Sequence, residues 1–436
     1  MSLQIVAGGS GSGKSTYIYS DVIEKSMKYP EKNYIVVVPE QYTMATQKKL
    51  VESHPRKGIL NIDVVSFERL SYKVFEEIGG QNHPVLDDTG KNLIVRKVLG
   101  DNRDKLRYFG SNINKTGFVS ELKSVISEFL QYDIDVKRLG EIRERVEDSR
   151  QLSAKLDDIS VVYSAFKEYL ADNYITSEEI LSVLCSVIDR SENIKRSEII
   201  LDGFTGFTPI QYRLIELLLI YSGKVTVSVT ADSREKLNVN EGIQQLFFMS
   251  KEMVSKLYRI CDVIHVDVLN PIILDNEKNP RFVSDEIAFL EKNIFRNNNQ
   301  SYNKKCEDIK IITAQTPKEE LNYCISEILR LTRYEGYRYR DIAIVSADMA
   351  SYGILAGNIC RQNRIPCFVD KKKPVTDHPF VEYIRSALEI IEKSFTYDSM
   401  FRYLRSGMSG ISREDVDLLD NYCLAVGIRG SKQWHG

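Results

Sequence analysis

The residues best suited to chemistry lie near the start of the chain, where a glycine-rich segment follows an apolar one. Residues 3–7 are apolar except for Gln4 and favour a strand, and they lead directly into a G-x-x-x-x-G-K-S pattern. This spacing after a strand predicts a phosphate-binding loop. Its residues are Gly8, Gly9, Ser10, Gly11, Ser12, Gly13, Lys14, Ser15 and Thr16.

The residue types of this loop explain what it can bind. Glycines allow the backbone to point its N–H groups at a polyphosphate, in conformations closed to residues with a Cβ. A helix beginning after Gly13 directs its positive end at the same phosphates, Lys14 adds a charge, and the Ser15 hydroxyl is a ligand for Mg²⁺. The alternative is a flexible linker, which needs neither this spacing nor a preceding strand. We therefore expect ATP and Mg²⁺ to bind here.

A second ligand for Mg²⁺ is expected at the end of a later strand. An apolar run over residues 198–201 ends in Asp202, where an acidic residue can help to hold the ion. The alternative is a turn or capping aspartate. Hydrolysing motors place a water-orienting glutamate directly after this aspartate, but here Gly203 follows and offers no proton acceptor. We expect weak or absent hydrolysis and assign no catalytic residue.

The elements that position these residues alternate between strands and helices. This alternation predicts a doubly wound α/β domain, with Ser66 as the N-cap of one helix. Strands are expected at residues 33–38, 60–65, 198–202 and 225–230, and helices at residues 16–26, 67–75 and 209–221.

Two further regions complete the predicted organisation. From residue 79 to residue 196 the apolar residues follow a helical period, which predicts a helical insertion. A second α/β unit is expected from strands at residues 309–313, 341–345 and 365–370. The chain stops at Gly436 without completing that second sheet, which suggests a fragment of a longer polypeptide.

Composition excludes several classes of protein. The 436 residues are 43% hydrophobic and 28% charged with a net charge of −2, which is typical of a soluble globular protein without a strong basic field. No apolar run approaches the ~20 residues of a membrane span, and no secretory signal precedes the loop. None of the seven cysteines forms a C-x-x-C pair, so no zinc site or cluster is indicated. We expect a cytoplasmic protein with reduced thiols and no membrane partner.

Several blocks together identify a family. Besides the loop, they are V-V-P-E-Q-Y-T at residues 37–43, S-F-E-R-L at residues 66–70, L-D-G-F-T-G-F-T-P at residues 201–209, and Y-R-Y-R-D-I-A-I-V at residues 337–345. The chain resembles the N-terminal part of the B subunits of the bacterial ATP-dependent helicase/nuclease AddAB, of the type found in Firmicutes. The match extends over nearly the whole chain, and the D-G-F-T-G-F-T-P block is more specific than the phosphate-binding loop.

The resemblance implies two RecA-like P-loop NTPase domains of the superfamily 1 helicase type, each with an insertion. The first domain would comprise residues 1–78 and 197–295, and residues 79–196 would be its helical insertion. The second domain would begin at residues 305–375 and be truncated, and residues 376–436 would be its helical insertion. It also implies a heterodimer with the A subunit, acting on single-stranded and double-stranded DNA ends in break repair and recombination. A nuclease domain with a cysteine-ligated iron–sulfur cluster is expected only beyond this chain.

The family's B subunit is regarded as a degenerate helicase that grips single-stranded DNA and reads the Chi signal. Three departures from active helicases agree with that: the missing glutamate, no room upstream for a glutamine motif, and Thr230-Ala231-Asp232 in place of G-D-x-x-Q. The alternatives are an active ATP-driven motor and a small-molecule kinase with a phosphate-binding loop. The kinase alternative predicts one compact domain, against which the insertion and the second unit argue.

Candidate DNA contacts follow two of the predicted strands, in loops where hydroxyl, amide and guanidinium groups can hold phosphates and a ring can stack on a base. For Phe67, core packing is an equal alternative. The run at residues 371–373 is also basic, although such a run is more typical of a solvated loop. The six candidates are Gln41, Tyr42, Thr43, Ser66, Phe67 and Arg69.

Overall fold

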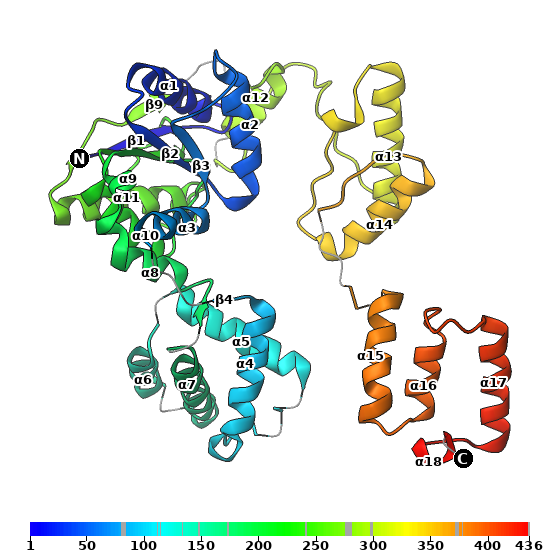
Figure 1. Ribbon diagram of the computed structural model, residues 1–436. Coiled ribbons are helices and arrows are strands. Elements are labelled where there is room, and N and C mark those ends of the chain that lie inside the picture. Colours follow the sequence, from blue (N-terminus) through cyan, green and yellow to red (C-terminus); the bar gives the residue numbers. More distant parts are fainter. Residues whose placement is uncertain are drawn as a thin grey trace. The chain divides into compact units, whose positions relative to one another are not determined.

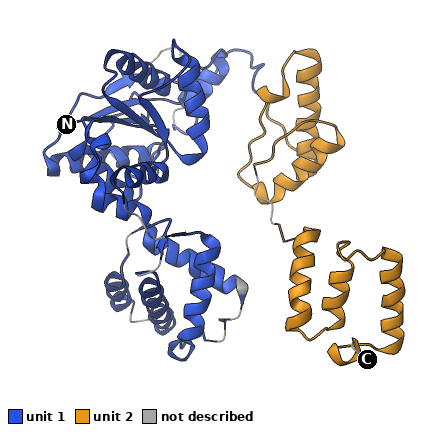
Figure 2. Ribbon diagram, viewed as in Figure 1, with its two compact units in different colours: residues 1–309 blue, residues 310–436 orange. Residues whose placement is uncertain are grey.

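The chain divides into two compact units, residues 1–309 and residues 310–436, which are described separately (Figure 2). The computed structural model describes residues 1–79, 84–110, 112–113, 115–132, 134–146, 149–171, 174–239, 242–274, 281–296, 300–370, 375–376 and 378–434. No helix in these ranges is both long enough and apolar enough to cross a bilayer.

A parallel sheet organises the first unit (Figure 1). Its strands have the order β3-β2-β6-β7-β1-β8, and β9 pairs with β1. The pairings described are all parallel; Leu3 lies opposite Val225, for example, and Val36 opposite Ile200. The α/β class is therefore confirmed. The strands are β1 (Ser2–Gly8), β2 (Asn33–Val37), β3 (Ile62–Val65), β6 (Ser197–Leu201), β7 (Lys224–Thr230), β8 (Asp267–Val268) and β9 (Ile272–Leu274).

Both faces of this sheet are buried, which is why its strands read as continuous apolar runs. In β2, Ile35 and Val37 belong to one apolar cluster, while Tyr34 and Val36 belong to another. Side chains alternate along a strand, so the two clusters lie on opposite faces. One cluster includes residues of α1 and α2, and the other includes residues of α3, α8, α10 and α11.

The helices of the α/β part begin with recognisable caps. Ser66 accepts the backbone N–H of Arg69 at 3.3 Å, as its capping role predicts, and Thr208 forms a capping box with Gln211. The helical segments are α1 (Lys14–Lys28), η1 (Glu40–Tyr42), α2 (Thr43–Ser53), α3 (Phe67–Ile78), α8 (Ile180–Val187), η3 (Ile188–Arg190), α9 (Glu192–Lys195), α10 (Pro209–Tyr221), α11 (Phe248–Ile264) and α12 (Asp285–Asn293).

The helices that lie between α3 and α8 in the sequence form a separate apolar core. This core includes Ile94, Ile126 and Phe166, all buried. Residues of α8, η3 and α9 pack instead into the core of the sheet, so the insertion core is shorter than the predicted range 79–196. Its elements are β4 (Val85–Leu86), α4 (Asp88–Asp101), η2 (Arg103–Lys105), α5 (Thr116–Gln131), α6 (Val136–Arg145), α7 (Arg150–Ala171) and β5 (Ile175–Thr176).

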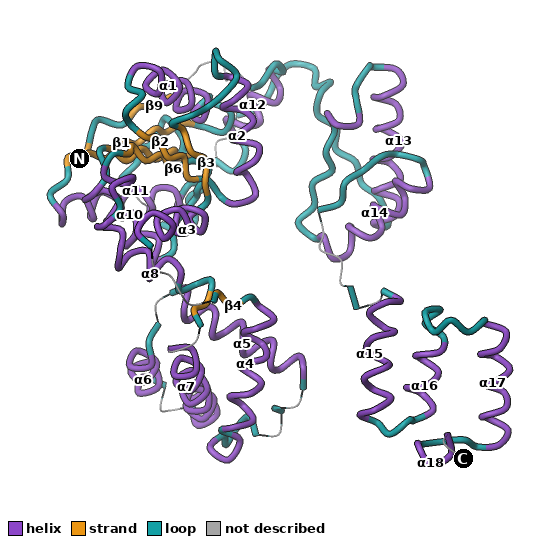
Figure 3. Tube along the Cα trace, viewed as in Figure 1, coloured by secondary structure: helices purple, strands orange, loops and turns teal. Residues whose placement is uncertain are grey.

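Helices joined by loops make up the second unit as the structure describes it (Figure 3). One small apolar core lies between α13 and α14, and another lies between α16 and α17. Its elements are α13 (Pro317–Tyr334), η4 (Tyr339–Asp341), α14 (Met349–Gln362), α15 (Pro379–Glu392), α16 (Tyr397–Leu404), α17 (Arg413–Val426) and α18 (Ser431–Trp434).

The three strands predicted for this unit are not formed in the described residues, and a second RecA-like domain is not confirmed. Residues 309–313 and 365–370 are loops, and residues 341–345 are the end of η4 followed by loop. Several of their apolar side chains are exposed (Ile311 92%, Val345 92% and Phe368 89%), whereas Ile365 packs into the small core with α13 and α14. A strand needs a hydrogen-bonded neighbour, and no other segment described in this unit pairs with these three. Local β preference alone does not supply a partner.

Candidate functional site

The predicted phosphate-binding loop connects β1 to α1, as the sequence pattern requires. Gly11 and Gly13 have φ angles of 78° and 91°, which residues with a Cβ rarely adopt. A Cβ on Gly8 would lie 2.5 Å from Ser12 Oγ and 2.7 Å from the carbonyl oxygen of Leu274. Gly8, Gly11 and Gly13 are therefore needed for the shape of the loop.

Lys14 is the first residue of α1, and its ammonium group contacts the start of the loop. Its Nζ donates hydrogen bonds to the carbonyl oxygens of Gly8 at 3.0 Å and Gly9 at 2.8 Å. Burial lowers the pKa of this ammonium; the charge of Asp202 partly offsets that effect, whereas the nearby charge of Arg281 adds to it. A desolvated cation at the head of a helix can hold a phosphate group.

Asp202 follows β6 and is 6% exposed. Its carboxylate accepts hydrogen bonds from the hydroxyl groups of Tyr19 at 2.6 Å and Ser228 at 2.5 Å. Burial raises the pKa of Tyr19 strongly, and the adjacent carboxylate raises it further. Tyr19 belongs to α1 and Ser228 to β7, the strand between β6 and β1, so the carboxylate connects three elements of the fold.

A pocket of about 480 Å³ lies between the loop and the end of β6. Ser15 and Asp202 both line it, so the two predicted ligands of Mg²⁺ share one pocket. Their hard oxygen donors suit that ion. The size is within the ~300–1,000 Å³ usual for small-molecule sites. Six of the nine predicted loop residues line it: Ser10, Gly11, Gly13, Lys14, Ser15 and Thr16.

The backbone turns away sharply after Asp202. Gly203 has a φ of 84°, and its N–H donates to Ser228 Oγ at 3.2 Å. Glu198, the acid at the other end of the same strand, pairs instead with Lys25 at 3.4 Å. A further acidic residue near the loop is Glu291 of α12, whose Oε1 would lie 3.7 Å from a Cβ on Gly9. Glu291 is not among the residues that line the pocket.

The six candidate DNA residues lie at one edge of the sheet. They follow β2 and β3, which are parallel neighbours, so both groups lie beyond the same ends of the strands. Gln41, Tyr42 and Arg69 are exposed, and Tyr42 is 50% exposed. Thr43 and Ser66 are buried; the Thr43 hydroxyl donates to the carbonyl oxygen of Glu40 at 2.9 Å.

Phe67 packs into an aromatic cluster beneath this edge. Its ring centroid is 5.3 Å from that of Phe204 and 6.2 Å from that of Phe207, and it is 7% exposed. This burial favours the packing role that was the alternative to stacking on a base. Phe204 also lines the pocket beside the loop, so the cluster extends from the candidate DNA edge to that pocket.

Several residues around the pocket were not predicted from the sequence. They include Tyr19 and Ser228, whose hydroxyl groups donate to Asp202, and Lys49 and Arg281, which line the same pocket. The sequence holds only one hint of these: Tyr19 is one helical turn after Ser15, so the two share a helix face.

Asp232, in the place where a motor has G-D-x-x-Q, is buried in an ion cluster. Its carboxylate accepts bonds from Arg234 at 2.6 and 2.8 Å and from Arg296 Nε at 2.7 Å. The hydrogen bonds from Arg234 are the main reason that the pKa of Asp232 lies well below its usual range. The cluster connects the end of β7 to the segment after α12, which is a structural role.

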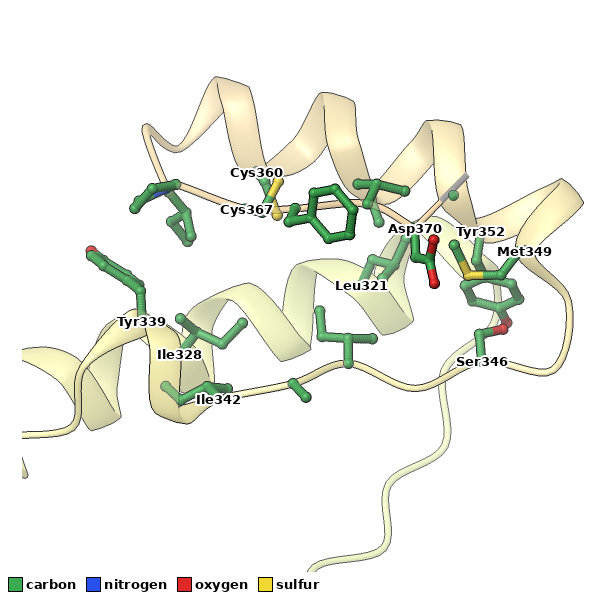
Figure 4. Close-up of a pocket in the computed structure, with 18 of the residues that line it drawn as sticks. Leu321, Ile328, Tyr339, Ile342, Ser346, Met349, Tyr352, Cys360, Cys367 and Asp370 are labelled. Carbon is green, nitrogen blue, oxygen red and sulfur yellow. The ribbon is translucent and has the colours of Figure 1, made fainter. Parts of the chain in front are cut away.

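A larger cavity of about 690 Å³ lies in the second unit, between α13, α14 and two loops (Figure 4). Its lining is mainly apolar, including Leu321, Ile328 and Ile342, and the predicted chemistry does not involve it. The basic run at residues 371–373 lies outside the described residues.

Comparison with known proteins gives one family. A family model described as "ADDB, N-terminal" matches residues 5–291. Among curated proteins, the chain is 44% identical over 438 residues to the B subunit of the ATP-dependent helicase/deoxyribonuclease of Lachnoclostridium phytofermentans, and 36% identical over 435 residues to the protein of the same name from Clostridium novyi. These alignments cover 100% of this chain but only 38% of each relative.

Proposed function

The chain belongs to the AddB N-terminal family, and on that premise we propose that it binds ATP and single-stranded DNA within the B subunit of a helicase/deoxyribonuclease. One observation supports this most directly. The phosphate-binding loop faces Asp202 across a pocket, and the residue after Asp202 is a glycine with a left-handed backbone. The site therefore has the groups to hold a nucleotide and lacks the adjacent group that would activate water.

In this proposal Lys14 and the loop N–H groups hold the phosphates, and Ser15 and Asp202 hold Mg²⁺. The ion, when bound, neutralises charge on the phosphate oxygens. Tyr19 and Ser228 fix the orientation of the Asp202 carboxylate by donating to its two oxygens. ATP then acts as a ligand that stabilises the α/β part, and turnover is slow or absent.

The proposal places single-stranded DNA at the edge after β2 and β3. Gln41, Tyr42 and Arg69 are exposed there and can reach phosphates or bases, whereas Thr43, Ser66 and Phe67 are buried and support them. Arg69→Ala should weaken binding to all sequences alike and reduce the salt dependence of the affinity by about one phosphate contact. We also propose that the Chi signal is recognised at this edge.

The relatives are named as one subunit of an ATP-dependent helicase/deoxyribonuclease. We therefore propose an A-subunit partner, DNA ends as the substrate of the complex, and a role in double-strand break repair and recombination. The nuclease and its iron–sulfur cluster are assigned to the part of the relatives that this chain does not cover.

Nucleotide binding is tested with the full chain. The unmodified protein should bind a non-hydrolysable ATP analogue, and Lys14→Ala should weaken that binding at least about tenfold, because a charge-assisted contact is lost. Lys48→Ala is the control, since Lys48 lies on α2 with its side chain 76% exposed. Steady-state ATP turnover with single-stranded DNA should stay near background. Robust turnover that depends on Lys14 would support the active motor instead, with Glu291 the first carboxylate to substitute.

A further inference from the structure

We infer that Lys49 and Arg281 are further phosphate-binding residues of the pocket, and that they make it select a nucleoside triphosphate over a diphosphate. This rests on the proposed nucleotide binding and goes beyond it, because neither residue belongs to the loop pattern or to the strand that ends in Asp202. Both line the same pocket as Lys14 and Ser15.

The charges that line the pocket favour a highly charged anion. Three of the lining residues are cations (Lys14, Lys49 and Arg281), and one, Asp202, is a carboxylate. That carboxylate already accepts bonds from two hydroxyl groups. The side chains of the lining therefore carry a net positive charge, and the three phosphates of a nucleoside triphosphate complement it better than two.

Lys49 reaches the pocket from α2, on the side of Asp202. Its Nζ lies 5.4 Å from the centre of the Tyr19 ring, and the hydroxyl of that ring donates to Asp202. Asp202 is the residue that would hold Mg²⁺ beside the terminal phosphates of a bound nucleotide. Lys49 thus lies near the terminal phosphate rather than near the base.

Arg281 reaches the pocket from the opposite edge of the sheet. It follows β9, whose Leu274 pairs with Gly8 at the start of the loop. Its charge contributes to the lowered pKa of Lys14, so the guanidinium lies within electrostatic reach of the ammonium that holds the terminal phosphates. An anion that binds between two such cations reduces their mutual repulsion. An arginine is suited to that position because its fork can bind phosphate oxygens in pairs.

The experiment compares nucleotides rather than turnover. Calorimetric titration of the full chain with a non-hydrolysable ATP analogue and with ADP, both with Mg²⁺, gives two affinities for each variant. Lys49→Ala and Arg281→Ala should each weaken the triphosphate about tenfold and ADP less than about twofold. Lys48→Ala on the same helix and Arg259→Ala on the surface of α11 should change neither affinity.

The outcomes separate this inference from the proposed function. If the unmodified chain binds no nucleotide, or if Lys14→Ala has no effect, the proposed function is wrong and the inference fails with it. If Lys14→Ala abolishes binding while Lys49→Ala and Arg281→Ala leave the preference for triphosphate unchanged, only the inference is overturned. Equal losses for ATP analogue and ADP would also overturn the selectivity.

Discussion

Gly203 offers the sharpest test of why this site should not hydrolyse ATP. Gly203→Glu supplies the glutamate that follows the aspartate in active motors. In this structure, however, Gly203 has a φ of 84°, a conformation that costs a residue with a Cβ about 1–2 kcal/mol. A Cβ there would meet only Pro39, at 3.5 Å, which is ordinary contact, so the cost is backbone strain alone.

The strain predicts a thermal shift. For a unit of 309 residues, about 1–2 kcal/mol corresponds to a decrease in Tm of about 1.5–3 °C, measured by calorimetry. Gly203→Ala should show the same decrease, because both variants add a Cβ, and Gly203→Asn a smaller one, since asparagine tolerates this conformation better. Gly223→Ala is the matched control: Gly223 is exposed without a positive φ, and its Cβ would meet an atom at an ordinary 3.6 Å.

The same variant tests the chemistry. Because the left-handed backbone fixes the direction of a side chain at position 203, the added carboxylate should not orient water, and DNA-stimulated ATP turnover should stay near background. Turnover in Gly203→Glu that is lost again in the double variant with Lys14→Ala would refute the reasoning, since it would show that one added side chain is enough for hydrolysis. A Tm equal to that of the unmodified protein would refute the strain.

Three further predictions concern hydrogen bonds made by side chains that follow the carboxyl ends of strands: Asp232 after β7, Asp202 after β6 and Ser66 after β3. Asp232→Asn should reduce the free energy of unfolding by about 2–3 kcal/mol at neutral pH. The fold lowers the pKa of Asp232, so the stability that its carboxylate contributes is complete above the unfolded-state pKa near 4 and is lost as the pH falls through the folded-state pKa. Denaturant titrations should therefore show the free energies of unfolding of the two proteins converging in acid. Tyr19→Phe removes one of the two hydroxyl donors that orient the Asp202 carboxylate, so the ATP analogue should need a higher Mg²⁺ concentration for half-maximal binding; an equal requirement in both proteins would mean that the phenol does not position the carboxylate for the ion. Ser66→Ala should cost about 1 kcal/mol through loss of the cap on α3, and Ser66→Thr should recover most of it in the same denaturant assay.

Much of the first unit could be predicted because its signals are local. The loop spacing, the apolar runs that became β1, β2, β6 and β7, and the cap at Ser66 each depend on residues within a few positions of one another. Strands buried on both faces of a parallel sheet are continuous apolar runs, so their positions along the chain can be predicted without knowing which strands pair. Asp202 could be chosen because it ends one such strand.

The sequence by itself determined that a glycine-rich loop with phosphate-binding spacing, an acidic residue after a strand and a glycine after that residue are present; the tertiary structure decided what surrounds them. The hydroxyl of Tyr19, 183 positions from Asp202, and Arg296, 64 positions from Asp232, reach their carboxylates only after the sheet has assembled. The strands predicted after residue 308 fail for the same reason: a strand exists only when another segment lies beside it, and residue preference does not encode that neighbour.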